Sequence, residues 1–330
     1  MAMPSTRGVP MRPRRGCALA AALAATACVA AVPAAKAHPA ASGHAAAKPT
    51  IVLVHGAFAD GSCWDAVIHR LQRDGYRVVA PANPLRGLRG DSEYIAGVLK
   101  SIRGPVVLAG HSYAGAVISG AAVGNANVKA LVYIAALVPG QGEVLSVLSD
   151  KFHGSELSSA VASFRYTKPG GGTGTDLFIK PDRFRPVFAA GLPKTITAVL
   201  AATQRPISAS AFDDRAGPAA WKAVPSWALV AGQDKAIAPA LQRFEYKRAH
   251  SHTVEVNSPH LAMVAQPKAV TDLVLRAAGS RASDDAKPAG TSADKGSAAP
   301  IVAGAVGAAL IVGAGLGVAV VTRGRRAGRP

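Results

Sequence analysis

The chain has 330 residues, 49% of them hydrophobic, and a formal net charge of +18. That length suits one large α/β domain or two smaller ones. The sequence holds no basic run interleaved with aromatic residues and no nucleic-acid-binding motif, so nucleic acid is not an expected partner. Residues 38–280 contain 25 basic and 16 acidic side chains, which makes the expected folded part only moderately basic.

The first 37 residues have the pattern of an export signal. Three arginines between positions 12 and 15 precede an uncharged apolar stretch over 16–32, and an A-x-A site follows at 35–37. This order is typical of a cleaved leader, so we predict a signal peptide over 1–37 and a short linker over 38–49. A short membrane anchor is the alternative, although 17 apolar residues are few for a span.

Cysteine usage limits the covalent chemistry of the chain. Cys17 and Cys28 lie in the predicted leader, and Cys63 is the third cysteine. A chain that has lost its leader then has one cysteine and forms no intramolecular disulfide. Cys63 is interpreted as a packed thiol beside Trp64 rather than as a nucleophile.

Short apolar segments alternate with amphipathic ones through the middle of the chain. Most of the apolar segments are continuous and rich in β-branched residues, as buried parallel strands require. We therefore predict strands at 50–54, 77–81, 105–109, 129–135, 227–232 and 252–256. Apolar residues at helical spacing predict helices around 64–71, 95–102 and 270–277, with Ser62 and Asp91 as helix N-caps.

This alternation predicts one α/β domain over 50–279, with a mainly parallel six-stranded sheet and helices on both faces. The interval 137–225 has no clear strand and contains helix-like pieces such as 184–203. We predict that it is an inserted helical cap over the carboxyl edge of the sheet, where ligands bind in open α/β sheets.

The C-terminal region has the pattern of a membrane anchor. Residues 280–299 are small, polar and dotted with proline, and they predict a disordered tether. A stretch of 21 residues without a polar side chain follows, and it predicts a transmembrane helix over 300–322. The arginines of the basic tail at 323–330 place that end in the cytoplasm and everything before residue 300 outside.

A serine lies where the third predicted strand ends, in the motif GHSYAG at 110–115. A sharp strand-to-helix turn lifts such a serine clear of the sheet, and the residues two before and two after it must be small. Gly110 and Ala114 occupy those positions, with Gly115 next along the chain. Ser112 is therefore the candidate nucleophile, which needs a base to take its proton.

Two backbone N–H groups are candidates for binding a developing oxyanion. HGAF at 55–58 follows the first predicted strand, and Gly56 allows close approach of the backbone. At a strand-to-helix turn of this kind, called a nucleophile elbow, one donor is the backbone N–H of the residue after the nucleophile and the other is a backbone N–H in this loop. We therefore expect Tyr113 and Ala57 to be the donors, and His55 to be structural.

An acid and a histidine follow in the order that the motif needs. Asp234 follows directly after the predicted strand 227–232 in the motif GQD, and His260 lies in SPHLAM after the last strand. Asp234 is the expected partner that orients His260 as the general base, and Glu143 is the alternative acid. His111 is expected to pack rather than react.

The chain resembles the α/β-hydrolase fold family, in the branch of plant methylesterases, hydroxynitrile lyases and related bacterial esterases. The resemblance rests on VLVHGAF, AGHSYAG, AGQDKAI and SPHLAMVAQP, and it covers about 50–278. It implies six parallel strands under a mobile cap, a catalytic triad of Ser112, Asp234 and His260, and no cofactor or metal. Leu261 stands where the lyases of this branch carry a lysine, which argues against cyanohydrin cleavage.

The expected function is that of a serine esterase held outside the cell membrane by its C-terminal helix. Its expected partner is a small apolar ester. Two alternatives share the scaffold: a protein that binds small molecules with little or no catalysis, and lyase or cofactor-free oxygenase chemistry in the same pocket.

Overall fold

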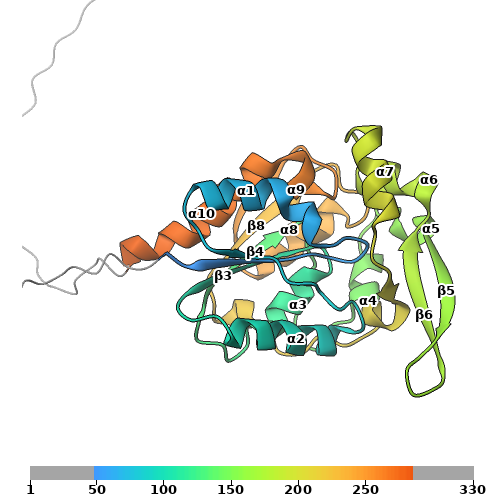
Figure 1. Ribbon diagram of the computed structural model, residues 1–330, viewed down its shortest axis with the longest axis horizontal. Helices are drawn as coiled ribbons and strands as arrows, with labels where there is room; N and C mark the ends of the chain where they lie inside the picture. Colours follow the sequence, from blue (N-terminus) through green and yellow to red (C-terminus); the bar gives the residue numbers. More distant parts are fainter. Residues whose placement is uncertain (1–47, 285–330) are drawn as a thin grey trace, which may run out of the picture. The chain divides into compact units, whose positions relative to one another are not determined.

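The computed structural model describes residues 48–284, and its centre is a parallel sheet (Figure 1). The strand order is β2-β1-β3-β4-β8-β9 and all neighbouring pairs are parallel. The strands are β1 (Thr50–Val54), β2 (Val78–Val79), β3 (Val106–His111), β4 (Val128–Ile134), β8 (Ser226–Ala231) and β9 (His252–Val256). Each overlaps a segment predicted as a strand, so the predicted six-stranded parallel sheet is confirmed.

Helices cover both faces of the sheet, as the alternating pattern predicts. In Figure 1, α1 (Asp65–Arg73), α9 (Ala262–Ala265) and α10 (Pro267–Asp284) lie above the sheet, and α2 (Leu88–Lys100) and α3 (Ala114–Ala121) lie below it. The helix α8 (Pro239–Arg248) shares the face of α3, because Tyr133 of β4 contacts both helices. Its hydroxyl bonds Ser119 of α3, and its ring stacks on Tyr246 of α8.

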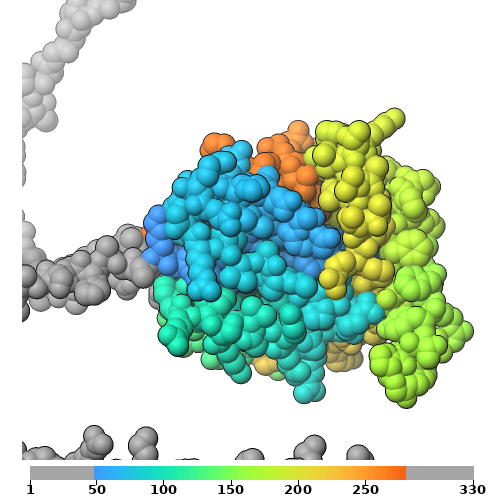
Figure 2. Space-filling view, in the orientation of Figure 1, coloured from blue at the N-terminus to red at the C-terminus, as the bar shows by residue number. Residues whose placement is uncertain are grey.

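The chain between β4 and β8 forms an insertion at one end of the domain, coloured green to yellow in Figures 1 and 2. Its helices are α4 (Leu145–Asp150), α5 (Leu157–Ala160), α6 (Pro181–Arg183), the π-helix η2 (Phe184–Phe188), α7 (Lys194–Ala202) and the 3₁₀ helices η3 (Ala209–Phe212) and η4 (Ala220–Lys222). Another 3₁₀ helix, η1 (Gly61–Trp64), precedes α1. We call the segment 137–225 the cap.

The prediction of a purely helical cap is wrong, because the cap also holds a three-stranded antiparallel sheet. Its strands are β5 (Val161–Thr167), β6 (Thr173–Ile179) and β7 (Ile207–Ser208). Gly170, Gly171 and Gly172 close the β5–β6 hairpin with φ of 82°, 100° and 79°, a region that favours glycine. Along β5, VASFRYT, apolar and polar residues alternate from Ala162 onward, which is a local strand signal that the prediction of a helical cap did not use.

The predictions for the two ends of the chain concern mainly residues outside 48–284. None of the helices within residues 48–284 is long and apolar enough to cross a membrane. The predicted signal peptide 1–37 and the predicted transmembrane helix and tail, 300–330, lie outside the described residues. The helix α10 continues to Asp284 and so takes in the first residues of the predicted tether, since extending an existing helix costs little.

A carboxyl group is buried on α8. Glu245 has no solvent exposure, and its oxygens make no hydrogen bond of ordinary geometry within the described residues. The nearest cation is Arg248, whose Nη2 lies 3.9 Å from Oε1 and which is itself paired with Glu143. Burial raises the pKa of Glu245 to about 8.

Because of this buried carboxyl group, we expect the free energy of unfolding to fall as the pH rises. The folded state holds the proton more tightly than the unfolded chain, whose pKa is near 4.5, so stability falls as the pH rises from about 4.5 to about 8. Glu245→Gln keeps the shape without the charge. We expect its Tm to exceed that of the wild type by at least about 4 °C at pH 9 and to match it at pH 5.

Thermal unfolding of both proteins across this pH range checks the prediction. Glu93→Gln, which changes an exposed glutamate on α2, is the matched control and should show no such pH-dependent gain. A Glu245→Gln variant that is less stable than the wild type at pH 9 would contradict the expected cost of the buried charge.

Candidate active site

Ser112 lies at a strained turn between β3 and α3. Its φ is +57°, in the left-handed region that non-glycine residues rarely adopt. Two backbone hydrogen bonds hold the turn: the Ser112 N–H donates to Ile134 O at 3.2 Å, and the Leu137 N–H donates to Ser112 O at 3.1 Å. Strain at such a position persists only where the surroundings enforce it, and it is typical of functional sites.

The small residues around the turn are needed for different reasons. A Cβ on Gly110 would lie 2.7 Å from Ala114 O, so the backbones of strand and helix touch there. A Cβ on Gly115 would collide with Leu137 O and lie 2.7 Å from Ala136 Cβ. Ala114 is fully buried without such a conflict. The glycine that this elbow requires after the serine is therefore at 115, and alanine is accommodated at 114.

His260 joins Ser112 to Asp234. The ring lies in the loop after β9, fully buried, with Nε2 at 2.9 Å from Ser112 Oγ and Nδ1 at 2.7 Å from Asp234 Oδ2. A carboxylate oxygen only accepts, so Nδ1 carries the proton and Nε2 presents its lone pair to the serine hydroxyl. This is the tautomer that a general base for Ser112 needs.

Asp234 is held in one orientation by four donors. Oδ1 accepts the backbone N–H groups of Ala236 at 2.7 Å and Ile237 at 2.9 Å. Oδ2 accepts Gln242 Nε2 at 2.8 Å as well as the histidine. The two oxygens therefore have distinct roles: one ties the carboxylate to the turn after β8, and the other orients His260.

The loop after β1 packs directly against the elbow. A Cβ on Gly56 would lie 2.7 Å from both His111 O and Ser112 Cβ, so only glycine permits this approach. His55 anchors the loop from behind: its Nε2 accepts the Asn83 N–H at 2.9 Å, and its Nδ1 then donates to Gly56 O at 2.9 Å. Burial lowers the pKa of His55, consistent with a neutral, structural ring.

The two predicted oxyanion donors are free to bind an acceptor. Neither the Ala57 N–H nor the Tyr113 N–H donates a backbone hydrogen bond within residues 48–284. Ala57 lines the same cavity as Ser112. Buried N–H groups are almost always bonded, so a pair without partners beside a strained serine points to a ligand that supplies the acceptor.

A cavity of about 420 Å³ opens beside Ser112. The body of the domain contributes Ala57, Phe58, Ala236 and Ile237, and the cap contributes a larger apolar set: Leu137, Phe152, Leu157, Val161, Leu177, Phe188 and Phe212. Polar residues of the cap also line it: Ser146, Ser149, Asp150, His153, Ser155 and Ser158. The volume and the mainly apolar wall suit a small organic molecule.

The cap residues are the part of this site that sequence reasoning missed. The glycine run at 170–172, between segments rich in Thr, Phe and Tyr, was the available signal for a hairpin. It would have placed Leu177 on a strand. Which cap side chains face the serine depends on how the cap folds back, and no local pattern carries that information.

The other candidates from the sequence have different places. Glu143, the alternative acid, accepts both guanidinium nitrogens of Arg248 at 2.8 Å and does not contact His260. His111 packs against His260 with ring centroids 4.6 Å apart, and burial lowers its pKa well below the ordinary value. Cys63 is a buried thiol. Within the described residues no group of three or more side chains is placed to hold a metal ion.

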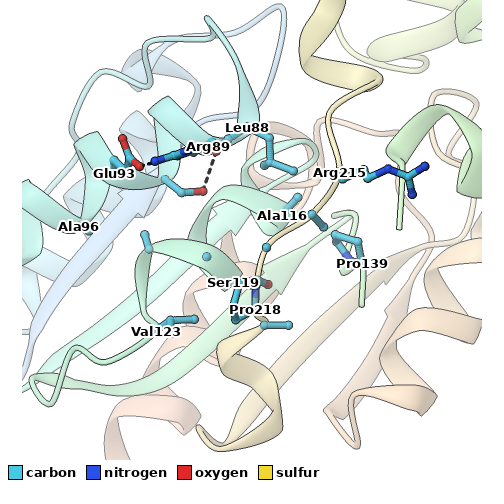
Figure 3. Close-up of a pocket in the computed structure, with 16 residues that line it drawn as sticks. Leu88, Arg89, Glu93, Ala96, Ala116, Ser119, Val123, Pro139, Arg215 and Pro218 are labelled. Atoms are coloured by element: carbon cyan, nitrogen blue, oxygen red, sulfur yellow. Dashed lines mark hydrogen bonds and ion pairs between the residues drawn. The ribbon is translucent and has the colours of Figure 1, made fainter. Parts of the chain in front are cut away.

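A second cavity, of about 340 Å³, lies between α2, α3 and residues 215–219 (Figure 3). Of its charged residues, Arg89 and Glu93 pair with each other and Arg215 donates to Gly142 O. Its buried hydroxyl, Ser119, bonds Gly115 O and Tyr133 Oη. Its lining includes neither Ser112 nor His260. We therefore assign the candidate active site to the cavity beside Ser112.

Comparison with known proteins identifies the family. The model of the "Alpha/beta hydrolase family" matches residues 51–273, most of the chain. The chain belongs to the alpha/beta hydrolase family. The match spans the sheet, the elbow, the cap and the loop that holds His260.

Curated relatives match shorter parts of this alpha/beta hydrolase. The carbendazim hydrolyzing esterase of Nocardioides sp. (strain SG-4G) is 34% identical over 121 residues, 33% of this chain and 50% of the relative. The pyrethroid hydrolase of Sphingobium wenxiniae is 36% identical over 104 residues, 28% of this chain and 37% of the relative. The chain thus spans half or less of the curated relatives that it matches.

Solved structures support the same fold. Polyneuridine aldehyde esterase superposes with a TM-score of 0.60 at 19% identity, covering 69% of this chain and 98% of that protein. Tomato methylketone synthase I gives 0.59 at 19%, covering 72% and 99%, and a pyrethroid hydrolase from Sphingobium faniae JZ-2 gives 0.56 at 23%, covering 71% and 99%. At these identities the likeness concerns the fold.

Proposed function

We propose that this alpha/beta hydrolase is a serine esterase with Ser112 as nucleophile, His260 as general base and Asp234 as the residue that orients the histidine. The observation that carries the proposal is the continuous chain of hydrogen bonds from Asp234 through His260 to Ser112, at 2.7 and 2.9 Å, beside an apolar cavity. The names of the two curated relatives, an esterase and a hydrolase, support the same reaction class.

In the proposed mechanism Ser112 Oγ attacks the ester carbonyl while its proton moves to His260 Nε2. The carbonyl oxygen becomes an oxyanion and accepts hydrogen bonds from the N–H groups of Ala57 and Tyr113. The tetrahedral intermediate then breaks its bond to the alcohol oxygen, which takes the proton from His260. Water, activated by His260, attacks the acyl group in the second half, and Ser112 regains its proton.

The cavity supports a small apolar ester as the substrate class. Aromatic and aliphatic side chains from both the body and the cap would surround the acyl or alcohol group. The position after the catalytic histidine is Leu261, which supplies no charged group for cyanohydrin chemistry.

Two measurements test the proposal. A fluorophosphonate probe should label the wild type, with the adduct found by mass spectrometry on Ser112. A panel of esters, lactones and amides should show turnover of small apolar esters. A folded protein that binds these compounds without labelling or turnover would instead support the binding-protein alternative, and cyanide release from mandelonitrile would support lyase chemistry.

We also propose that the domain is displayed outside the cell membrane, on the basis of the leader-like residues 1–37 and the apolar stretch 301–321. The last turn of α10 lies at the end of the domain opposite the cap (Figure 1). A tether that starts there would leave the cap facing away from the membrane. Protease treatment of intact and lysed expressing cells tests the location, since protection in intact cells would overturn it.

A further inference from the structure

The segment 80–91, from the end of β2 into the first turn of α2, lies between the cap hairpin and the turn that carries Ser112. It bonds both. Arg86 extends its side chain to the cap, and its own backbone N–H donates to Asp91 Oδ1 at 3.0 Å. Asp91 in turn accepts the Tyr113 hydroxyl. The segment therefore forms a continuous connection between two parts of the site that are far apart in sequence.

At one end of this connection, Asp91 bonds the side chain of Tyr113, whose backbone N–H is a proposed oxyanion donor. Tyr113 is buried, and its hydroxyl donates to Asp91 Oδ2 at 2.8 Å. Burial raises the pKa of Tyr113, which keeps the hydroxyl a donor. Asp91, predicted from the sequence as an N-cap, lies instead within the first turn of α2 and is fully buried. The prediction was wrong because both its oxygens already bond elsewhere.

The second half reaches the cap hairpin. Arg86 Nη1 donates to Asp176 Oδ1 at 2.8 Å and Oδ2 at 3.0 Å, and to Tyr166 Oη at 3.2 Å. Arg86 Nη2 donates to Pro206 O at 2.8 Å. The side chain of Asp176 is 10% exposed. The side chain of Arg86 is 43% exposed, but its guanidinium group is held by several directed hydrogen bonds, which include one from Nε to Pro84 O at 3.3 Å.

The hairpin end of the connection also touches the substrate cavity. Asp176 precedes Leu177, which lines the cavity beside Ser112. The Ser208 N–H on the neighbouring strand β7 donates to Leu85 O at 2.9 Å, so the hairpin sheet is joined to the same segment twice. A shift of the hairpin would therefore move the groups that bond Arg86 and Leu85.

We propose that Arg86 and Asp91 are positioning residues that couple the seating of the cap hairpin to the orientation of the Tyr113 N–H. The proposal rests on the esterase function proposed above. An oxyanion donor works only when its N–H points to where charge develops, so a small rotation of the Tyr113 peptide costs rate. Asp176 of the hairpin would fix the side chain of Arg86. The backbone of Arg86 would fix the Asp91 carboxylate, and that carboxylate would fix the hydroxyl end of Tyr113.

A direct contact offers another route between the cap and Tyr113. Phe212 of the cap lies edge-on to the Tyr113 ring, with centroids 6.0 Å apart. That contact does not pass through Asp176. A substitution at Asp176 therefore separates the two routes, because it leaves Phe212 in place.

A double-mutant cycle in kcat tests the coupling. The two changes are Tyr113→Phe, which removes the hydroxyl that bonds Asp91, and Asp176→Asn, which removes the charge that holds Arg86. The substrate is p-nitrophenyl acetate, whose acyl group is too small to need the cap. We expect each single change to lower kcat by roughly 5- to 20-fold with KM changed less than about twofold.

The double variant decides between coupling and independence. Residues that act through one connection give non-additive effects, so the double variant should be no more than about twofold slower than the slower single variant. A product of the two single effects would overturn the proposal. An Asp176→Asn variant that raises only the KM of bulky esters would also overturn it, because that result is expected if Asp176 only stabilises the position of the cap. Asp182→Asn, an exposed cap aspartate, is the control and should match the wild type.

Hydrogen–deuterium exchange gives a readout that does not depend on ester cleavage. The amides of Gly115 and Ala116 bond the carbonyls of Ser112 and Tyr113. Asp176→Asn should speed their exchange several-fold, and Asp182→Asn should not. Unchanged exchange would overturn the coupling. Absence of wild-type turnover with faster exchange would instead overturn the esterase and leave the coupling standing. If Asp176→Asn does not fold, Arg86→Lys breaks the same contacts.

Discussion

Ser112→Ala is expected to lower kcat for short p-nitrophenyl esters by roughly 10⁴- to 10⁶-fold and to abolish fluorophosphonate labelling. The proposed reaction runs through the serine oxygen, and no hydroxyl is left in its place. The fold should survive, because within residues 48–284 the Ser112 Oγ makes a single hydrogen bond, to His260 Nε2 at 2.9 Å. Serine and alanine both carry a Cβ, which is the atom that disfavours the positive φ of +57° at this position, so the substitution adds no new backbone conflict.

The measurement is steady-state turnover, with thermal unfolding as the check on folding. Ser119→Ala is the matched control. Ser119 is a buried serine on α3 whose hydroxyl bonds Gly115 O and Tyr133 Oη, away from His260. It should keep kcat within about threefold and still be labelled. A Ser112→Ala protein that kept a tenth of the wild-type kcat would show that another group attacks the ester.

Asp234→Asn is the second large effect, and its physical reason is specific to this site. The two backbone donors at Oδ1, Ala236 and Ile237, require an oxygen there. The amide NH₂ of the new asparagine must then replace Oδ2, where it meets the Nδ1–H of His260 and the NH₂ of Gln242, and donors oppose donors.

The histidine escapes this conflict by moving its proton to Nε2, which leaves it unable to take the proton of Ser112. We expect kcat to fall by about 10⁴-fold with KM little changed. Glu143→Gln is the matched control for the alternative acid: Glu143 pairs with Arg248, so its loss should cost stability and change kcat by less than about threefold. A larger loss of kcat in Glu143→Gln than in Asp234→Asn would reverse the assignment.

The strands and the chemical motifs could be predicted from the sequence because they are encoded locally. A strand buried on both faces must be a continuous apolar run, as TIVLV in β1 and WALVA in β8 are. A serine at a strand end between small residues predicts a tight turn, and the structure places it at φ +57°. The order of Ser112, Asp234 and His260 then predicted their meeting at one edge of the sheet.

The cap shows where local patterns fail. The alternation along β5 was a local signal for a strand, but the side chains of the cap that face the cavity depend on how the cap folds back on the body. Asp91 likewise has the residue type and position of an N-cap, and the structure uses it to bond Tyr113 and Arg86. For Asp91 the outcome was decided by Tyr113, which lies 22 residues further along the chain.

The sequence by itself determined the sheet, the helices around it, the nucleophile turn and the three residues of the proposed triad. Each of these depends on burial or on steric limits within a few residues. Only the tertiary structure decided that Gly115 rather than Ala114 is the critical small residue, since its constraint is Leu137 O on another element. It also decided which cap side chains enclose the cavity and that Arg86 links the cap to Tyr113. Those arrangements arise from contacts between segments 80 to 120 residues apart, such as Arg86 with Tyr166 and Pro206, and no local pattern specifies them.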